Sequence, residues 1–280
     1  MTRLLDESPA RIKMLVAPAG YGKTTLARQW LATGRASAWL QCGPQSADVA
    51  ELLDELAGLI TLVAPIAGPR LRDRLRSTTH PARELDVLTE ILLEDLQHWP
   101  SEAWLVVEDY QFIADSPAAE FLFAGLASAS ALNLLICGRR RPGWATARRV
   151  VYGEIADLGK SELAMTAMEG RELLGPAPRR DAVLELARGW PALLSLATFV
   201  DSERWRLEPL PTTIYSFLAE EIYSSLSPEV RHALPIVALG ANLTTAQVRG
   251  ALGTLAETVI GEGLVSGMID ISLRTQVIEI

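Results

Sequence analysis

The sequence has 280 residues, of which 49% are apolar, so the chain can build a hydrophobic core and does not have the composition of a disordered protein. Its 26 basic and 34 acidic residues give a formal net charge of −8. This charge disfavours direct binding to nucleic-acid backbones or to anionic membranes, because both need a basic surface. Charged residues also interrupt every apolar segment before it reaches the roughly 18 residues that a membrane-spanning helix needs.

Cysteine content and the first residues indicate a compartment. Cys42 and Cys137 each lie in an apolar, strand-like segment, which predicts buried thiols in a reducing environment. Residues 1–7 contain no apolar segment of the kind found in secretory signals. We therefore expect the protein in the cytoplasm.

The first half of the chain alternates short apolar segments with segments of helical periodicity. Strands are predicted at 12–16, 36–40, 103–107 and 132–137, and helices at 26–31, 51–63 and 83–99. Residues 65–81 are basic and contain proline, which favours a loop or an irregular helix. Nearly all-apolar strands that alternate with helices indicate an α/β fold whose parallel sheet is covered by helices on both faces. Such sheets bind ligands at the carboxyl ends of their strands.

The pattern changes after Arg149. One further strand is predicted at 150–158, and shorter helical segments follow it. The spacing of capping boxes predicts helix starts at Thr166 and Thr244. Residues 261–280 alternate apolar and polar side chains, which is typical of a small hairpin.

A glycine-rich segment after the first strand carries the clearest chemical signal. Residues 17–25 read Ala-Pro-Ala-Gly-Tyr-Gly-Lys-Thr-Thr and lie between a predicted strand and a predicted helix, which is the context of a phosphate-binding loop. Gly20 and Gly22 allow positive φ, so that successive N–H groups can converge on an anion at the start of the helix. The segment opens with Ala17 where the strict pattern has glycine. The alternative is a glycine-rich turn with an incidental lysine.

The polar residues at the end of this loop have separate expected roles. Lys23 can reach the β- and γ-phosphates, and the Thr24 hydroxyl can bind Mg²⁺. Thr25 would support the phosphates from behind. The candidate nucleotide-binding residues of the loop are Pro18, Ala19, Gly20, Tyr21, Gly22, Lys23, Thr24 and Thr25.

Two acids follow the strand predicted at 103–107. Glu108 is expected to bind the hydrated metal, and Asp109 is expected to polarise the attacking water or to bind the metal beside Glu108. The candidate metal ligands are therefore Thr24, Glu108 and Asp109. The alternative is an acidic strand end that faces solvent.

Two further segments have both a structural and a functional interpretation. Three arginines in succession, 139–141, follow the strand predicted at 132–137, and we favour Arg139 as the one that approaches the γ-phosphate. At least one of the others is expected to belong to a solvated basic turn. Gly189-Trp190-Pro191 is either a helix break with a core tryptophan or a motif whose Pro191 packs on adenine.

Together these motifs resemble the signal-transducing ATPases with numerous domains (STAND), in the branch of the maltose-regulon activator and the large ATP-binding regulators with LuxR-type tails. Residues 17–26 are similar to the phosphate-binding loop of that branch, and residues 106–110 resemble its metal-binding strand, with Glu108 where an aspartate is usual. Arg139 matches the first sensor arginine of the family. Pro191 matches the proline of its glycine-x-proline motif, which touches the base.

The resemblance implies a domain organisation and a switch. Residues 1–149 would form the nucleotide-binding domain, 150–210 a small helical domain, and 211–280 a winged-helix domain, which we expect to be incomplete. Bound ADP would hold a closed state, and ATP with Mg²⁺ would favour a self-associating state that slow hydrolysis resets. Lys23, Glu108, Asp109 and Arg139 would carry the catalysis. The resemblance also implies that sensor and DNA-binding regions lie on a longer parent chain.

Two other classes of function remain open from the sequence. The first class is an ordinary P-loop enzyme, such as a small-molecule kinase or a remodelling ATPase. In a kinase, residues 70–76 could form a basic lid. A non-catalytic interaction module, in which nucleotide only holds the domains together, is the other.

Overall fold

The computed structural model describes most of the chain and divides it into two compact units. The described residues are 2–65, 68–129, 132–176, 180–199, 226–240, 243–271 and 276–279, together with 216, 220 and 223. The first unit consists of Met1–Val16 and Lys23–Leu163, and the second of Ala17–Gly22 and Ala164–Ile280. Each unit is described by itself below.

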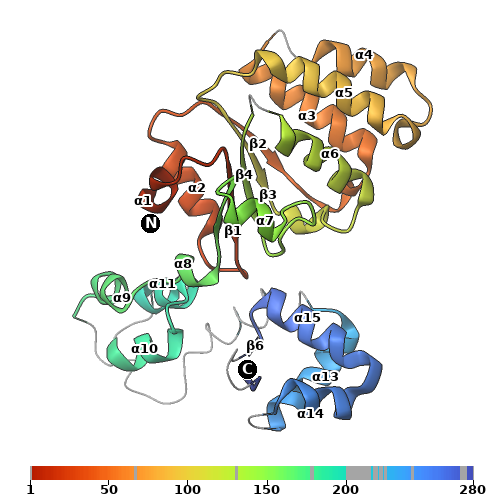
Figure 1. Ribbon diagram of the computed structural model, residues 1–280. Coiled ribbons are helices and arrows are strands. Elements are labelled where there is room, and N and C mark those ends of the chain that lie inside the picture. The colour runs from red at the N-terminus through yellow and green to blue at the C-terminus, as the bar shows by residue number, and fades with distance from the viewer. Residues whose placement is uncertain are drawn as a thin grey trace. The chain divides into compact units, whose positions relative to one another are not determined.

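The first unit is built on a five-stranded parallel sheet, as the sequence predicts (Figure 1). Its strands are β1 (Ile12–Val16), β2 (Ser37–Gln41), β3 (Trp104–Glu108), β4 (Asn133–Gly138) and β5 (Ile155–Leu158), in the order β2-β3-β4-β1-β5. The phosphate-loop strand β1 is therefore not a neighbour of the acidic strand β3, because β4 lies between them. All three strands nevertheless end at the same edge of the sheet, since they run parallel in register.

Helices cover both faces of this sheet. They are α1 (Thr2–Glu7), α2 (Lys23–Leu31), α3 (Val49–Val63), α4 (Pro69–Ser77), α5 (Leu85–Asp95), α6 (Pro117–Ser128), α7 (Ala147–Val151) and α8 (Lys160–Leu163). Helix α2 lies on one face, and α3 to α6 lie on the other, where they share one apolar core with the strands (Figure 1). Both thiols, Cys42 and Cys137, are free and buried, as predicted.

The basic segment between α3 and α5 forms a regular helix, α4. Its arginines lie at every second position from 70 to 76, and fully buried Leu71 joins the core. Arg70 pairs with Glu94 at 2.8 Å, and Arg74 pairs with Glu84. These two arginines are therefore already paired with acids of the first unit. The pairing supports a solvated helix face rather than a lid that binds substrate.

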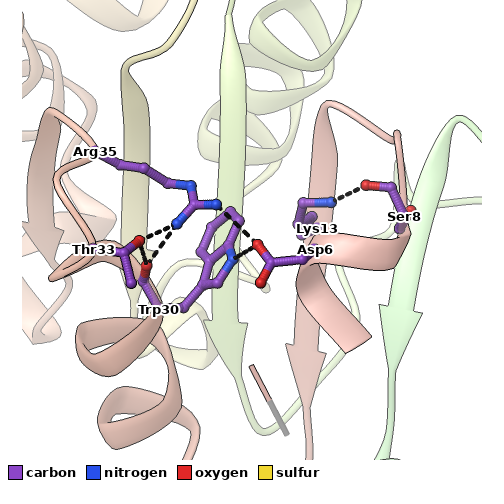
Figure 2. Close-up of polar contacts among 6 residues, drawn as sticks. All are labelled: Asp6, Ser8, Lys13, Trp30, Thr33 and Arg35. Atoms are coloured by element: carbon purple, nitrogen blue, oxygen red, sulfur yellow. Dashed lines mark hydrogen bonds and ion pairs between the residues drawn. The ribbon is translucent and has the colours of Figure 1, made fainter. Parts of the chain in front are cut away.

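Helix α1 is attached to the sheet by a polar and aromatic cluster, which Figure 2 shows. Asp6 Oδ1 accepts hydrogen bonds from Trp30 Nε1 at 2.7 Å and from the Arg35 guanidinium at 2.8 Å. Lys13, only 2% exposed, donates to Ser8 O at 2.6 Å, and its ammonium lies 5.7 Å from the Trp30 ring centroid. Burial lowers the pKa of Lys13, while the nearby Asp6 charge opposes that shift. The cluster contacts β1 at Lys13, in the amino-terminal half of that strand.

The first unit extends beyond residue 149, where the sequence suggested its end. The segment 150–158 is not one strand: α7 continues to Val151, and only Ile155–Leu158 forms β5. Because β5 pairs with β1 in parallel, it completes the sheet and belongs to the first unit.

The second unit contains two groups of helices. The first group is α9 (Ala167–Leu174), α10 (Arg180–Ala187) and α11 (Pro191–Phe199), and the second is α13 (Pro228–Leu239), α14 (Thr245–Leu252) and α15 (Ala256–Ser266), followed by β6 (Asp270–Ile271) and β7 (Ile278–Glu279). Each group has its own apolar core. The predicted capping boxes at Thr166 and Thr244 are both confirmed.

The carboxyl-terminal segment differs in part from its prediction. Residues 261–266 belong to α15, so the hairpin is limited to the short antiparallel pair β6–β7. The winged helix at 211–280 stays a prediction, and its expected boundary at 210 lies outside the described residues. Within the described part of the chain, every helix is too short or too polar to cross a bilayer.

Candidate nucleotide-binding site

The glycine-rich segment forms the turn between β1 and α2. Gly20 and Gly22 have φ of 77° and 73°, in the left-handed region that glycine favours. Lys23 is the first residue of α2, so the amino-terminal end of that helix directly follows the turn. The local conformation is therefore the one that the sequence predicts for a phosphate-binding loop.

Trp190 of the Gly-Trp-Pro segment and the residue after that segment, Ala192, hold the main chain of this turn. Trp190 Nε1 donates to Ala19 O at 3.0 Å, and the Ala192 amide donates to Gly20 O at 3.0 Å. A Cβ on Gly20 would lie 2.6 Å from both Trp190 Nε1 and Ala192 Cβ, so no side chain fits there. These contacts explain why Ala17–Gly22 groups with the second unit. Trp190 is thus more than a core residue, and its indole fixes a carbonyl of the loop.

An oxygen-rich pair joins the start of α2 to the end of β3. Burial raises the pKa of Glu108, while an interaction with the Thr24 side chain opposes this shift. Glu108 is only 4% exposed, and its Oε1 is buried without a hydrogen-bond partner among the described residues. A buried carboxylate oxygen is costly to leave unpaired, and Mg²⁺ prefers such oxygen ligands together with water and phosphate. The pair therefore fits Mg²⁺.

The described residues contain no group of three His, Cys, Asp or Glu side chains that could hold a metal by themselves. Mg²⁺ commonly takes most of its ligands from water and from substrate phosphates. Thr24 and Glu108 would supply the protein ligands.

Lys23 and Arg139 bring two positive charges close together. Burial and the Arg139 cation together lower the pKa of Lys23 to about 8, while Asp109 and Glu108 oppose the shift. Two neighbouring cations repel each other, and a polyanion beside them relieves that repulsion. The electrostatics of this edge of the sheet therefore favour a polyphosphate.

Asp109 has an unusual backbone and two amide partners. Its φ of 54° lies in the left-handed region, which aspartate tolerates better than most residues. Gln41 Nε2 donates to Asp109 Oδ2 at 2.7 Å, and Gln111 Nε2 donates to Oδ1 at 2.9 Å. Both carboxylate oxygens are therefore held in place.

The three successive arginines have different surroundings. Arg140 pairs with Asp115 at 2.6 Å, and Arg141 pairs with Asp157. The guanidinium of Arg139, by contrast, forms no ion pair within the part of the chain that the structure describes. Arg139 is the arginine of this group whose charge is not already neutralised, which supports its assignment to the phosphate.

The first unit thus brings together Lys23, Thr24, Glu108, Asp109 and Arg139 at the carboxyl edge of its sheet. Pro191 is buried at the first position of α11, and its expected contact with adenine stays a prediction. Gln41 and Gln111 were not predicted from the sequence. Neither residue stands in a pattern that signals a function, although each lies at or just beyond the end of a strand that was predicted.

Comparison with known proteins agrees with this geometry. No family model matches the chain. The transcriptional regulator MalT of Serratia proteamaculans is 24% identical over 204 residues, and MalT of Yersinia pestis is 26% identical over 204 residues; both alignments cover 70% of this chain and 22% of the regulator. The chain therefore spans about a fifth of the length of these curated relatives.

Two solved structures share the fold. A Walker-type ATPase of Pyrococcus abyssi matches with a TM-score of 0.59 and 19% identity, over 100% of this chain and 91% of that one. A STAND protein with a tetratricopeptide repeat sensor from Pyrococcus horikoshii matches with a TM-score of 0.52 and 15% identity, over 96% of this chain and 38% of that one.

The chain is thus similar in sequence to part of MalT, and it shares the α/β fold of the two solved ATPases. The best-defined part of this fold is the parallel sheet with the loop after β1.

Proposed function

We propose that this chain is a STAND-like core and the nucleotide switch of a transcription regulator: it binds ADP in one state, binds ATP with Mg²⁺ in a second, self-associating state, and returns by slow hydrolysis. The observation that carries the proposal is the group of charges at the edge of the sheet. The Lys23 ammonium and the Arg139 guanidinium adjoin a buried Glu108 whose Oε1 is unpaired. That arrangement matches a polyphosphate and a divalent cation together.

The residues of this edge would divide the work. The main-chain N–H groups of the loop and Lys23 bind the phosphates. Thr24 and Glu108 hold Mg²⁺, which neutralises charge on the phosphate oxygens when it is bound. Asp109, fixed by two amides, orients the attacking water. Arg139 interacts with the γ-phosphate, which ADP lacks.

A switch requires that the two nucleotides differ in their affinity for the two states. The γ-phosphate is the chemical difference between them, and Arg139 is the side chain that we assign to it. The proposal extends to transcription only through the named relatives, of which this chain spans about a fifth. A sensor and a DNA-binding region would then lie elsewhere on a parent protein.

The proposal is tested on the full chain by nucleotide binding and by Lys23→Ala. Mass spectrometry of the nucleotide carried through purification is expected to find ADP, and labelled ADP is expected to bind the wild type and not Lys23→Ala. Arg76→Ala is the matched control, because it removes a cation from the exposed face of α4. Equal binding by the wild type and Lys23→Ala would contradict the proposal.

Hydrolysis separates the switch from an ordinary enzyme. A switch turns ATP over slowly, whereas fast turnover or a phosphorylated metabolite among the products would indicate a remodelling ATPase or a kinase. The paired arginines of α4 already argue against the basic lid that a kinase would use.

A further inference from the structure

One side chain joins the ends of two strands at the proposed site. Gln111 Nε2 donates to Asp109 Oδ1 at 2.9 Å, and Gln111 Oε1 accepts from the Arg139 main-chain N–H at 3.0 Å. The orientation of the amide follows from its partners, because a main-chain N–H can only donate and a carboxylate can only accept. A single planar group therefore links the acid after β3 to the arginine after β4.

The turn that carries Gln111 is firmly anchored. Residues Tyr110–Phe112 form a 3₁₀ turn, closed by a hydrogen bond from the Phe112 amide to Asp109 O at 3.0 Å. Tyr110 is fully buried; its hydroxyl donates to Glu120 at 2.7 Å and accepts from Trp144 Nε1 at 3.0 Å. Such a turn has little freedom to move by itself, so it holds the Gln111 amide in a fixed place.

The end of β4 also lies very close to this turn. A Cβ on Gly138 would lie 3.2 Å from Tyr110 Cβ and 3.6 Å from Gln111 Oε1. The first of these distances is tighter than an ordinary contact. The glycine before Arg139 thus lets the main chain approach Gln111 closely enough for the hydrogen bond.

From this geometry we infer that Gln111 is a positioning residue, which couples the Asp109 carboxylate to Arg139 so that the two respond together to the terminal phosphate. Gln41 holds the other oxygen of Asp109 but comes from β2, so it does not provide this link to β4. A displacement of the Arg139 main chain passes to Asp109 through one amide. The inference rests on the function proposed above and adds to that site a residue that contacts no substrate.

Two variants separate the two hydrogen bonds. Gln111→Met keeps an unbranched side chain of similar volume and removes both bonds. Gln111→Glu keeps an oxygen for the Arg139 N–H but replaces the donor to Asp109 with a second carboxylate. Gln97→Met is the matched control, because Gln97 is exposed on the short helix that precedes the amino end of β3.

The readouts, with Mg²⁺ present throughout, are ATP turnover and the affinities for ADP and for a non-hydrolysable ATP analogue, measured by calorimetry. Gln111→Met is expected to lower the ratio of analogue affinity to ADP affinity about fivefold, the effect of one hydrogen bond, and to lower turnover as well. Gln111→Glu is expected to lower turnover and to leave the affinity ratio as in the wild type. Gln97→Met is expected to change neither quantity.

A merely structural role for Gln111 predicts a different result. In that case Gln111→Met would lower the melting temperature and would lower the affinities for ADP and for the ATP analogue by the same factor, so that the affinity ratio stays unchanged. That outcome, in a wild-type background that binds both nucleotides, overturns this inference and leaves the proposed function standing. A wild-type protein that binds neither nucleotide overturns both.

Discussion

At the scale of single residues, Lys23 carries a charge that the protein alone does not favour. Its pKa lies at about 8 rather than at the ordinary 10.5, because the side chain is desolvated and Arg139 is near. The free protein therefore loses this charge as the pH rises through about 8. Because binding of a polyphosphate needs the protonated form, proton uptake at alkaline pH and nucleotide binding are linked.

This linkage predicts a pH dependence of binding. The affinity of the wild type for ADP is expected to fall as the pH rises from about 7 to about 9, since the lysine titrates in that interval. Lys23→Arg removes this dependence, because arginine keeps its charge throughout the range. Fluorescence titration with labelled ADP at a series of pH values measures both slopes. Parallel slopes for the two proteins would show that Lys23 is not the group that titrates.

At the scale of elements, the attachment of α1 depends on one carboxylate. Asp6 Oδ1 accepts from the buried Trp30 indole and from Arg35. Removing it leaves the Trp30 N–H, on a side chain only 2% exposed, without its acceptor. Loss of the acceptor of such a buried donor costs about 1–3 kcal/mol. The hydrogen bond from Trp30 to Asp6 therefore contributes to the stability of the first unit, although α1 is a short helix.

We therefore expect Asp6→Ala to lower the free energy of unfolding by about 1–3 kcal/mol, measured by urea denaturation. Asp6→Asn is expected to lose less, because its amide oxygen still accepts from Trp30. Glu7→Ala is the control on the same helix, because it breaks only the ion pair with Arg3. The Arg3 side chain is 87% exposed and the Glu7 side chain is 54% exposed, and ion pairs between exposed side chains contribute less than about 1 kcal/mol. Equal losses for Asp6→Ala and Glu7→Ala would contradict the role assigned to the carboxylate.

At the scale of the whole molecule, the limit of the first unit follows from strand pairing. The unit includes β5, whose residues Ile155 and Leu158 are buried and pair with Ile12 and Leu15 of β1. A chain without β5 would expose one side of β1 as an unpaired edge strand, which favours aggregation.

Two truncated chains test this limit. Residues 1–163 are expected to unfold cooperatively, and residues 1–149 are expected to melt at a lower temperature or to aggregate. Circular dichroism during heating, with light scattering for aggregation, measures both. Equal melting temperatures would place the end of the folding unit at the earlier position.

The parts of the fold that could be predicted from the sequence are those that depend on residues close together in the chain. The apolar strands, the capping boxes and the positive-φ glycines depend on spacings of a few positions, so periodicity and turn chemistry reveal them. The two acids at the end of β3 and the arginines after β4 were found for the same reason, because each group follows an apolar segment. The strand predicted at 150–158 was wrong in its first half, since an apolar segment next to arginines suits a short helix equally well.

Contacts between distant residues were decided by the tertiary structure. Trp190 donates to Ala19 from 171 positions away, and Gln41 reaches Asp109 from 68 positions away. No local pattern marks a tryptophan or a glutamine for such a partner. Arg139 was already favoured among the three arginines from the sequence, and the acids that the fold places near Arg140 and Arg141 support that choice.

The sequence by itself thus determined the fold class and the groups available for phosphate and metal, because backbone conformation and helix periodicity are local properties. The tertiary structure decided which of those groups meet, which charges are already neutralised, and which neutral amides hold them. The physical reason is that pairing and burial depend on the packing of strands and helices that lie far apart in the chain.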